Sequence, residues 1–117
     1  MDLGTLIPVE RVVDVLDPRN GKPTGLKLTV AHDSDPRVVK AMRALWDDAR
    51  EKGGEDESRG LRATMAHVVG WEWTGDANFK GDKPKFTPEK LAEVCAIPAV
   101  GSAVYRAVTD EAGFYKA

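Results

Sequence analysis

Two strand-like segments separated by a dense turn restrict the first part of this chain to one local structure. Residues 9–16 are rich in Val and Leu, and residues 26–30 alternate apolar and polar side chains, which is typical of a strand with one buried face. Between them lies Asp-Pro-Arg-Asn-Gly-Lys-Pro, whose residue types favour turns. We therefore predict a β-hairpin. Because a lone hairpin is only marginally stable in water, other elements must cover it.

A first helix is predicted directly after the hairpin. Asp35 is a suitable N-cap, and Pro36 suits the first helical position. Apolar residues then recur at helical spacing, with charged residues between them, up to about Arg50. They are Val38, Val39, Met42, Leu45, Trp46 and Ala49. Two glycines at residues 53–54 should end this helix, and the acidic residues 55–58 should form an exposed connection.

A second helix is predicted from about Glu55 or Glu57 to Gly70, since acidic residues suit the positive end of a helix. Its expected apolar face consists of Leu61, Met65, Val68 and Val69. Residues 71–74 are predicted to form a short third strand beside the hairpin. Residues 75–85 are polar and rich in Gly, Lys and Asp, which predicts a mobile loop.

Two further helices are predicted in the last third of the chain. Thr87 and Pro88 suit the N-cap and the first position of the third helix. Its apolar face is formed by Leu91, Val94 and Cys95. Pro98 marks the start of the fourth helix, and Gly113 marks its end. Its apolar stripe consists of Val100, Val104, Tyr105 and Val108. We therefore predict a single α+β domain over residues 1–117, with an N-terminal β-hairpin and a third short strand packed with about four α-helices.

Composition argues against several functional classes. Lys and Arg number 17 and Asp and Glu 19, for a net charge of −2, so the basic excess of a sequence-independent nucleic-acid binder is missing. The apolar stretches fall far short of the roughly 20 residues that span a membrane, and we expect no secretory signal. A single cysteine leaves no intramolecular disulfide, which fits a reducing cytoplasm. We expect neither nucleic acid nor a membrane among the partners.

The residues that could carry chemistry show no catalytic spacing. A zinc site needs about four clustered ligands, whereas this chain offers His32, His67 and Cys95 at distant positions. We expect both histidines to be structural or solvated, and Cys95 to be a small buried hydrophobe. Neither a glycine-rich phosphate loop after a strand nor a serine nucleophile elbow is visible. We therefore expect no metal, no cofactor and no catalytic residue, and hence a protein that is not an enzyme.

The segment Val-Val-Gly-Trp-Glu-Trp-Thr-Gly at residues 68–75 is the most distinctive in the chain. On a strand Trp71 and Trp73 would point to the same face, because they are two residues apart. One interpretation places these indoles in the core. The other leaves part of an aromatic surface exposed for a protein partner. The candidate protein-binding residues are Trp71, Trp73, Phe79 and Phe86; we expect Trp71 to be mostly core, and Trp73 and Phe79 to contact the partner.

The order of the motifs points to a known family. A hairpin with the turn Pro-Arg-Asn-Gly-Lys-Pro is followed by a helix that begins Asp-Ser-Asp-Pro-Arg, then by Val-Val-Gly-Trp-Glu at residues 68–72 and Phe-Thr-Pro-Glu-Lys-Leu at residues 86–91. A helix from Pro98 and a near-terminal Phe114 follow. Over nearly its whole length, this order resembles the tail assembly chaperones of long-tailed bacteriophages.

That resemblance implies a role in assembly. Such chaperones bind the long, hydrophobic, helical tape measure protein in the host cytoplasm and keep it soluble, and they are absent from the mature virion. In many members a programmed frameshift produces a longer form that recruits the tail tube protein, and self-association would help to cover a long client. Two alternatives stay open. The chain could be a structural tail or head–tail component that pairs through a sheet edge, or a small protein directed at a host enzyme.

Overall fold

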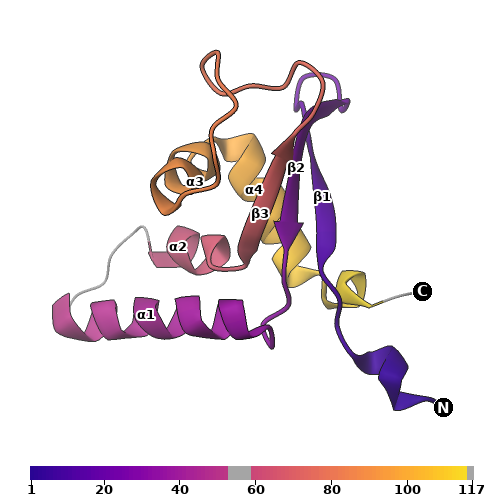
Figure 1. The fold of residues 1–117 in the computed structure, drawn as a ribbon, viewed down its shortest axis with the longest axis vertical. Coiled ribbons are helices and arrows are strands. Elements are labelled where there is room, and N and C mark those ends of the chain that lie inside the picture. Colours follow the sequence, from indigo (N-terminus) through magenta and orange to yellow (C-terminus); the bar gives the residue numbers. More distant parts are fainter. Residues whose placement is uncertain (53–58, 116–117) are drawn as a thin grey trace.

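A three-stranded antiparallel sheet organises the molecule. The computed structural model describes residues 1–52 and 59–115. The strands are β1 (Arg11–Leu16), β2 (Pro23–Val30) and β3 (Val68–Trp73), and β2 lies in the middle. Helices cover one side of this sheet, so the predicted α+β class, with its hairpin and third strand, is confirmed (Figure 1).

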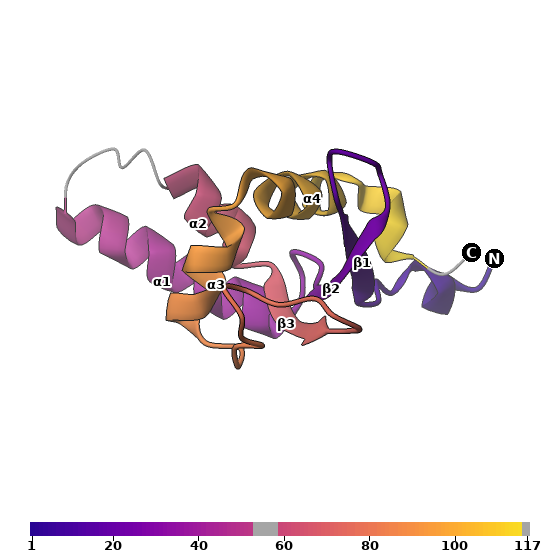
Figure 2. The ribbon, with the colours of Figure 1, turned by 90° about the horizontal axis from the view of Figure 1, so that it is seen from above.

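Four α-helices and two short 3-10 helices complete the described chain. The α-helices are α1 (Pro36–Lys52), α2 (Arg59–Met65), α3 (Pro88–Cys95) and α4 (Pro98–Thr109), and the 3-10 helices are Leu3–Leu6 and Glu111–Phe114. Helix α4 packs along β1 and β2 on one side of the sheet (Figure 2). Helix α1 lies beyond α2 and away from the sheet, with α2 as its main neighbour (Figure 1).

The hairpin forms as its alternating pattern predicts. Val13 pairs with Leu28 and Asp14 with Lys27. In β2, every second residue from Leu26 to Val30 is at most 4% exposed, which is the signature of a strand with one covered face. Strand β1 begins at Arg11, two residues later than predicted, because the Val9 N–H donates to the Phe114 carbonyl oxygen (2.7 Å).

The hydrophobic core lies between the covered face of the sheet and helices α3 and α4. Its largest fully buried side chains are Phe114, Leu28, Val30, Val94 and Val104. Phe114 comes from the C-terminal 3-10 helix and is only 1% exposed. The core is therefore closed by a residue that is far in sequence from the hairpin that it covers.

The second predicted helix ends earlier than expected, so its predicted C-terminal boundary was wrong. Helix α2 ends at Met65, and Val68 and Val69 belong to β3. Val68 pairs with Val30 of β2 and is buried. Pairing with β2 thus overrides the helical spacing, and β-branched valines suit a strand better than a helix. The predicted start at Glu55 or Glu57 and the connection at residues 55–58 lie outside the described residues.

Helix α3 matches its prediction, whereas α4 differs in two respects. The Thr87 hydroxyl accepts a hydrogen bond from the Lys90 N–H (3.2 Å), as the N-cap prediction requires. Helix α4 starts at Pro98 but ends at Thr109, so Gly113 is not its stop. The predicted stripe was also wrong for Tyr105, which is 60% exposed. The residues that α4 buries are Val100, Ala103, Val104 and Ala107, and the two alanines let the helix lie close to the sheet.

Helix α1 begins where predicted but leaves much of its apolar stripe uncovered. The Asp35 carboxylate accepts from the Arg37 N–H (2.9 Å), as an N-cap does. Among the side chains of α1 that the structure describes, Val38 alone is buried. Val39 and Trp46 are 41% and 57% exposed. The predicted helix is therefore present as α1, but most of its apolar stripe is not buried.

No single helix in the described ranges is long and apolar enough to cross a membrane. Helices α3 and α4 meet that test of length and composition only when taken together, as a pair bent by 101°.

The two glycines of the hairpin give the first testable prediction. Gly25 has φ +99°, and an added Cβ would lie 2.5 Å from the Thr74 carbonyl oxygen and 2.9 Å from the Ala77 Cβ. Gly21 has φ +72° with open space around it. Gly25→Ala should therefore lower the free energy of unfolding by about 2–3 kcal/mol, and the control Gly21→Ala by about 1 kcal/mol. Urea unfolding of both variants measures the difference. Equal losses would show that the contact with Thr74 does not matter.

Candidate functional site

The four aromatic residues singled out in the sequence lie on or beside the covered face of the sheet. Trp71 and Trp73 share that face, as predicted, and their rings meet edge to face with centroids 5.5 Å apart. Phe86 makes a similar contact with Trp71, at 5.2 Å. Edge-to-face pairs at these separations stabilise a fold beyond simple burial. The structure thus brings Trp71, Trp73 and Phe86 into one cluster.

The segment after β3 folds back over this cluster. The Trp71 indole N–H donates to the Pro84 carbonyl oxygen (3.1 Å), so it links the strand to the end of the loop. Inside the loop the Phe79 N–H donates to the Asp82 carbonyl oxygen (2.7 Å), and the Lys83 ammonium donates to the Gly75 carbonyl oxygen (2.9 Å). The predicted loop is therefore present and internally bonded, and its mobility stays a prediction.

An apolar cavity of about 490 Å³ lies on one side of the cluster, between the hairpin end, this loop and the α3–α4 junction. Trp73 and Phe79 both line it. In the described part of the chain the Trp73 indole nitrogen is buried without a hydrogen-bond partner. The burial of this nitrogen shows that Trp73 packs more deeply than a simple surface contact residue would. A buried N–H donor without a partner lowers the stability of the fold.

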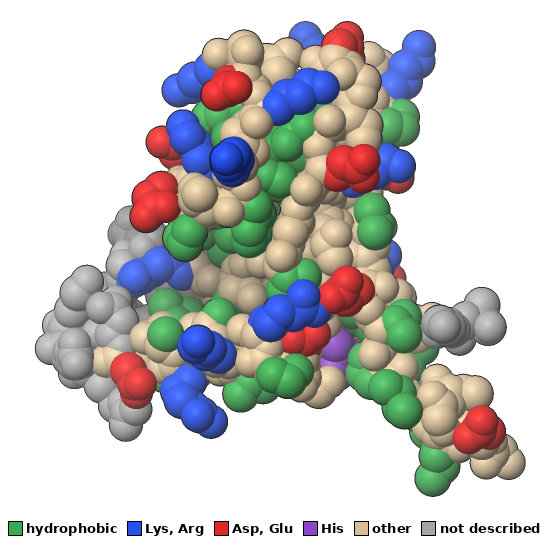
Figure 3. Space-filling view, viewed as in Figure 1, with side chains coloured by type: hydrophobic (Ala, Val, Ile, Leu, Met, Phe, Trp, Pro, Cys, Tyr) green, Lys and Arg blue, Asp and Glu red, His purple; other side chains and the backbone are tan. Residues whose placement is uncertain are grey.

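A second apolar groove, of about 620 Å³, lies on the other side of the cluster, and four elements form it. Its lining residues come from α1, the end of α2, β3 and the start of α3. The apolar side chains among them include Ala41, Leu45, Met65, Val69, Phe86 and Leu91. Hydrophobic side chains are visible in the hollow between α1 and the α3 region above it (Figure 3). Phe86 lies in this groove and is 39% exposed.

The predicted residues thus divide between two cavities. Trp73 and Phe79 line the first and Phe86 the second. Trp71 lines neither and packs against the core cluster, between Trp73 and Phe86. Sequence reasoning missed the contribution of α1 to the second groove. The spacing of Ala41 and Leu45 places both on one face of α1. The helical pattern alone, however, does not say which face of α1 the rest of the protein covers.

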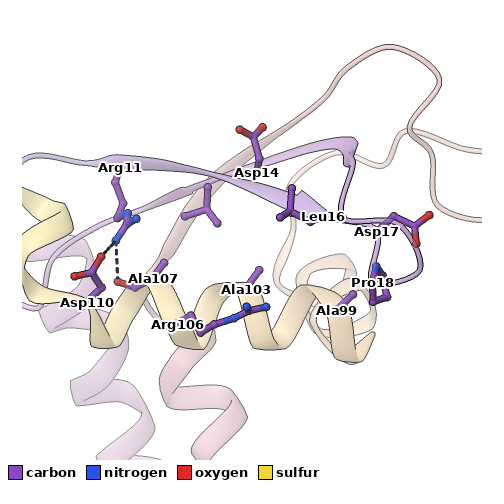
Figure 4. Close-up of a pocket in the computed structure, with 12 residues that line it drawn as sticks. Arg11, Asp14, Leu16, Asp17, Pro18, Ala99, Ala103, Arg106, Ala107 and Asp110 are labelled. Atoms are coloured by element: carbon purple, nitrogen blue, oxygen red, sulfur yellow. Dashed lines mark hydrogen bonds and ion pairs between the residues drawn. The ribbon is translucent and has the colours of Figure 1, made fainter.

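A third cavity, of about 550 Å³, runs between β1 and α4. Arg11 points from the strand toward α4, where its guanidinium donates to the Asp110 carboxylate (3.2 Å) and the Ala107 carbonyl oxygen (3.4 Å) (Figure 4). Asp14 points away from the helix (Figure 4). Arg11 also lies over the Phe114 ring, 5.8 Å from its centroid. These contacts close the core at the C-terminal end, which is a structural role.

The two histidines make structural contacts at the connection between β2 and α1. The His67 Nε2 lies 2.5 Å from the Asp33 carboxylate, and its Nδ1 lies 3.0 Å from the Ala63 carbonyl oxygen. The His32 Nε2 lies 2.6 Å from the Glu111 carboxylate. This contact and a hydrogen bond from the Tyr115 hydroxyl lower the pKa of Glu111. The histidines therefore tie this connection to the end of α2 and to the C-terminus.

The described residues hold no cluster of His, Cys, Asp and Glu that could bind a metal ion. Cys95 is 3% exposed, as expected for a small buried hydrophobe. Burial raises the pKa of its thiol to about 11, which leaves little of the reactive thiolate at neutral pH.

Comparison with known proteins identifies no family for this chain. It matches no protein-family model, no curated protein and no solved structure.

The hydrogen bond from Trp71 to Pro84 gives the second prediction. Trp71→Phe removes this donor and leaves the buried Pro84 carbonyl oxygen without it, which should cost about 1–2 kcal/mol. Amide exchange in residues 75–86 should accelerate at the same time, because the loop loses its attachment to β3. Trp46→Phe is the matched control, since Trp46 is 57% exposed and should change stability by less than about 0.5 kcal/mol. Unchanged loop exchange in Trp71→Phe would contradict this account.

The buried thiol gives the third prediction. Because the pKa of Cys95 is raised to about 11, its reaction with a thiol reagent at pH 8 should be roughly 100-fold slower than in the unfolded chain. The rate should rise with pH as the thiolate forms. The measurement is reagent kinetics on the native protein and on the protein in urea. If Cys95 reacts at comparable rates in the native and the unfolded protein, its thiol is accessible and its pKa is not raised.

Proposed function

We propose that this protein is a helix-binding assembly chaperone of the phage tail type, with the groove between α1 and α3 as its client site. The observation that carries the proposal is the groove itself, an apolar cavity of about 620 Å³ formed by four elements, in which the Phe86 side chain is 39% exposed. Grooves of this kind accept the apolar face of an amphipathic helix.

The chemistry of the groove suits such a client. Its apolar floor can cover side chains spaced one helical turn apart, and a long helical protein exposes such a face in water until it assembles. The charged residues that line the groove are Arg37 and Arg62. Arg37 already contacts the carboxylates of Asp35 and Glu10, so it is held in place at the rim.

The family resemblance supplies the remainder of the proposal. The client is the tape measure protein, bound in the host cytoplasm and released before the mature virion forms, without any chemical reaction. A frameshifted longer form would recruit the tail tube protein, and copies of the chaperone would associate along the client. The resemblance rests on the hairpin turn, the Val-Gly-Trp segment and the Phe-Thr-Pro-Glu helix start.

A structural component that remains in the particle is the second candidate. The observation in its favour is the position of β1, which pairs with β2 on one side and forms an edge of the sheet. Val12 and Leu16 on this strand are 62% and 47% exposed. An uncovered edge strand can pair with a strand of a neighbouring chain.

Co-expression tests the first candidate. Fragments of a phage tape measure protein should be soluble when produced with this chain and insoluble without it. If solubility does not improve, the chaperone proposal fails. Mass spectrometry of purified virions separates the two candidates, because a chaperone is absent from mature particles and a structural component is abundant in them.

Phe86 gives the fourth prediction. Phe86→Asp should weaken binding of a tape measure fragment by about 2 kcal/mol, or roughly 30-fold in Kd, because it places a charge in the apolar groove. Tyr105→Asp is the control, since Tyr105 is 60% exposed on α4 and does not line the groove. Titration calorimetry measures both, and circular dichroism verifies that both variants are folded. Equal weakening by the two variants would place the client elsewhere.

A further inference from the structure

Residues 1–7 form an apolar arm that the described part of the molecule leaves uncovered. The arm contains the short 3-10 helix Leu3–Leu6, which buries none of its residues. It runs outward from the start of β1, beyond the rest of the fold (Figure 1 and Figure 2). Its large apolar side chains, each at least half exposed, are Met1, Leu3, Leu6 and Ile7. Single exposed apolar residues are ordinary on a surface, but a cluster of this kind marks a contact with another surface.

The spacing within the arm is that of a helix that binds in a groove. Leu3 and Leu6 are three residues apart and Ile7 follows directly, so all three lie on one face of a helix. Apolar residues at positions i, i+3 and i+4 are the anchors of such a helix. The groove between α1 and α3, with Leu45 and Phe86 in its walls, is a receptor of that type. One chain thus carries both an apolar helical segment and an apolar groove.

The root of the arm lies at the rim of this groove. Glu10, three residues after Ile7, holds its carboxylate against the Arg37 guanidinium, and Arg37 lines the groove. The Val9 N–H donates to the Phe114 carbonyl oxygen, so the chain is fixed at this point. The arm points outward from the rim, and it therefore reaches the groove of a second copy placed against that rim. The reach is sufficient, because the five residues before Pro8 extend up to roughly 17 Å.

We propose that two copies of this chain exchange their arms, so that residues 1–7 of each copy occupy the groove between α1 and α3 of the other. The two contacts are identical, and the assembly therefore closes at two copies. In each contact Leu3, Leu6 and Ile7 cover the exposed part of Phe86. The arm has no basic side chain, so it brings none against the two arginines that line the groove. Because the buried segments are short, dissociation in the micromolar range is expected.

The consequence for the client rests on the proposed function, because the arm then occupies the proposed client site. An arm in the groove competes with the client. The free chaperone therefore shields its own apolar surface until a tape measure segment displaces the arms. The exchange itself needs only the arm and the groove, and it can be tested without a client.

Disulfide formation between two single variants tests the exchange. Leu6→Cys places a thiol on the arm and Ala44→Cys places one in the groove wall, while the native Cys95 is buried. Mixed under mild oxidation, these variants should give roughly tenfold more covalent heterodimer than Leu6→Cys mixed with Tyr105→Cys, because exchange holds the first pair together. Mass spectrometry of the linked peptides identifies the product. Equal yields from the two mixtures would overturn the proposal, as would a Leu6→Cys/Ala44→Cys double variant that links only within one chain.

Sedimentation equilibrium measures the strength of the pair. The wild-type chain should show a reversible monomer–dimer equilibrium, and deletion of residues 1–7 should abolish it. Leu6→Asp and Phe86→Asp, on the two sides of one contact, should each raise the dissociation constant by roughly 30-fold. Tyr105→Asp should leave it unchanged, because this residue is exposed on α4 outside the groove. Circular dichroism verifies that the variants are folded. A wild-type chain that stays monomeric at high micromolar concentration, or a deletion that still dimerises, would contradict the exchange.

A tape measure fragment separates this inference from the proposed function. The fragment should lower the yield of the heterodimer of Leu6→Cys and Ala44→Cys. It should also bind roughly tenfold more tightly to the chain without residues 1–7, because no arm has to leave the groove. Cross-linking that the fragment does not reduce would support the exchange and place the client elsewhere. A fragment that binds the wild-type chain where no cross-link forms would overturn the exchange and leave the client site standing.

Discussion

The pairing of β2 with strands on both sides is the interaction on which the other elements depend. Leu28 is fully buried, and it lies opposite Val13 on one side and Trp71 on the other. The first pair joins neighbouring segments, but the second joins residues that are far apart in the chain. Placement of β3 beside β2 in turn sets the position of the aromatic cluster, because Trp71 and Trp73 are part of that strand.

The local features of the fold could be predicted from sequence, while the boundaries set by distant contacts could not. The start of α3 depends on Thr87 and Pro88 alone, so its prediction was correct. The end of α2 depends on the pairing of Val68 with Val30, which helical spacing does not reveal. Tyr105 faces outward because Ala103 and Ala107 bring α4 close to the sheet, and this too is a tertiary effect.

The candidate site could likewise be predicted only where it depends on residues close together in the sequence. Aromatic residues close together in sequence pointed to Trp71, Trp73, Phe79 and Phe86, and three of them form direct ring contacts. The groove beside Phe86 could not be predicted, because its walls come from elements between Arg37 and Leu91 that only the folded chain brings together. Client contact by the four aromatic residues remains a proposal.

The different settings of the three tryptophans also give the protein two separate optical reporters. Trp71 and Trp73 are close enough for their excited states to interact, so their signal follows the integrity of β3. Trp46 is far more open to water, and its emission follows the surroundings of α1. Fluorescence and circular dichroism can therefore observe the sheet and the outer helix independently in the unlabelled chain.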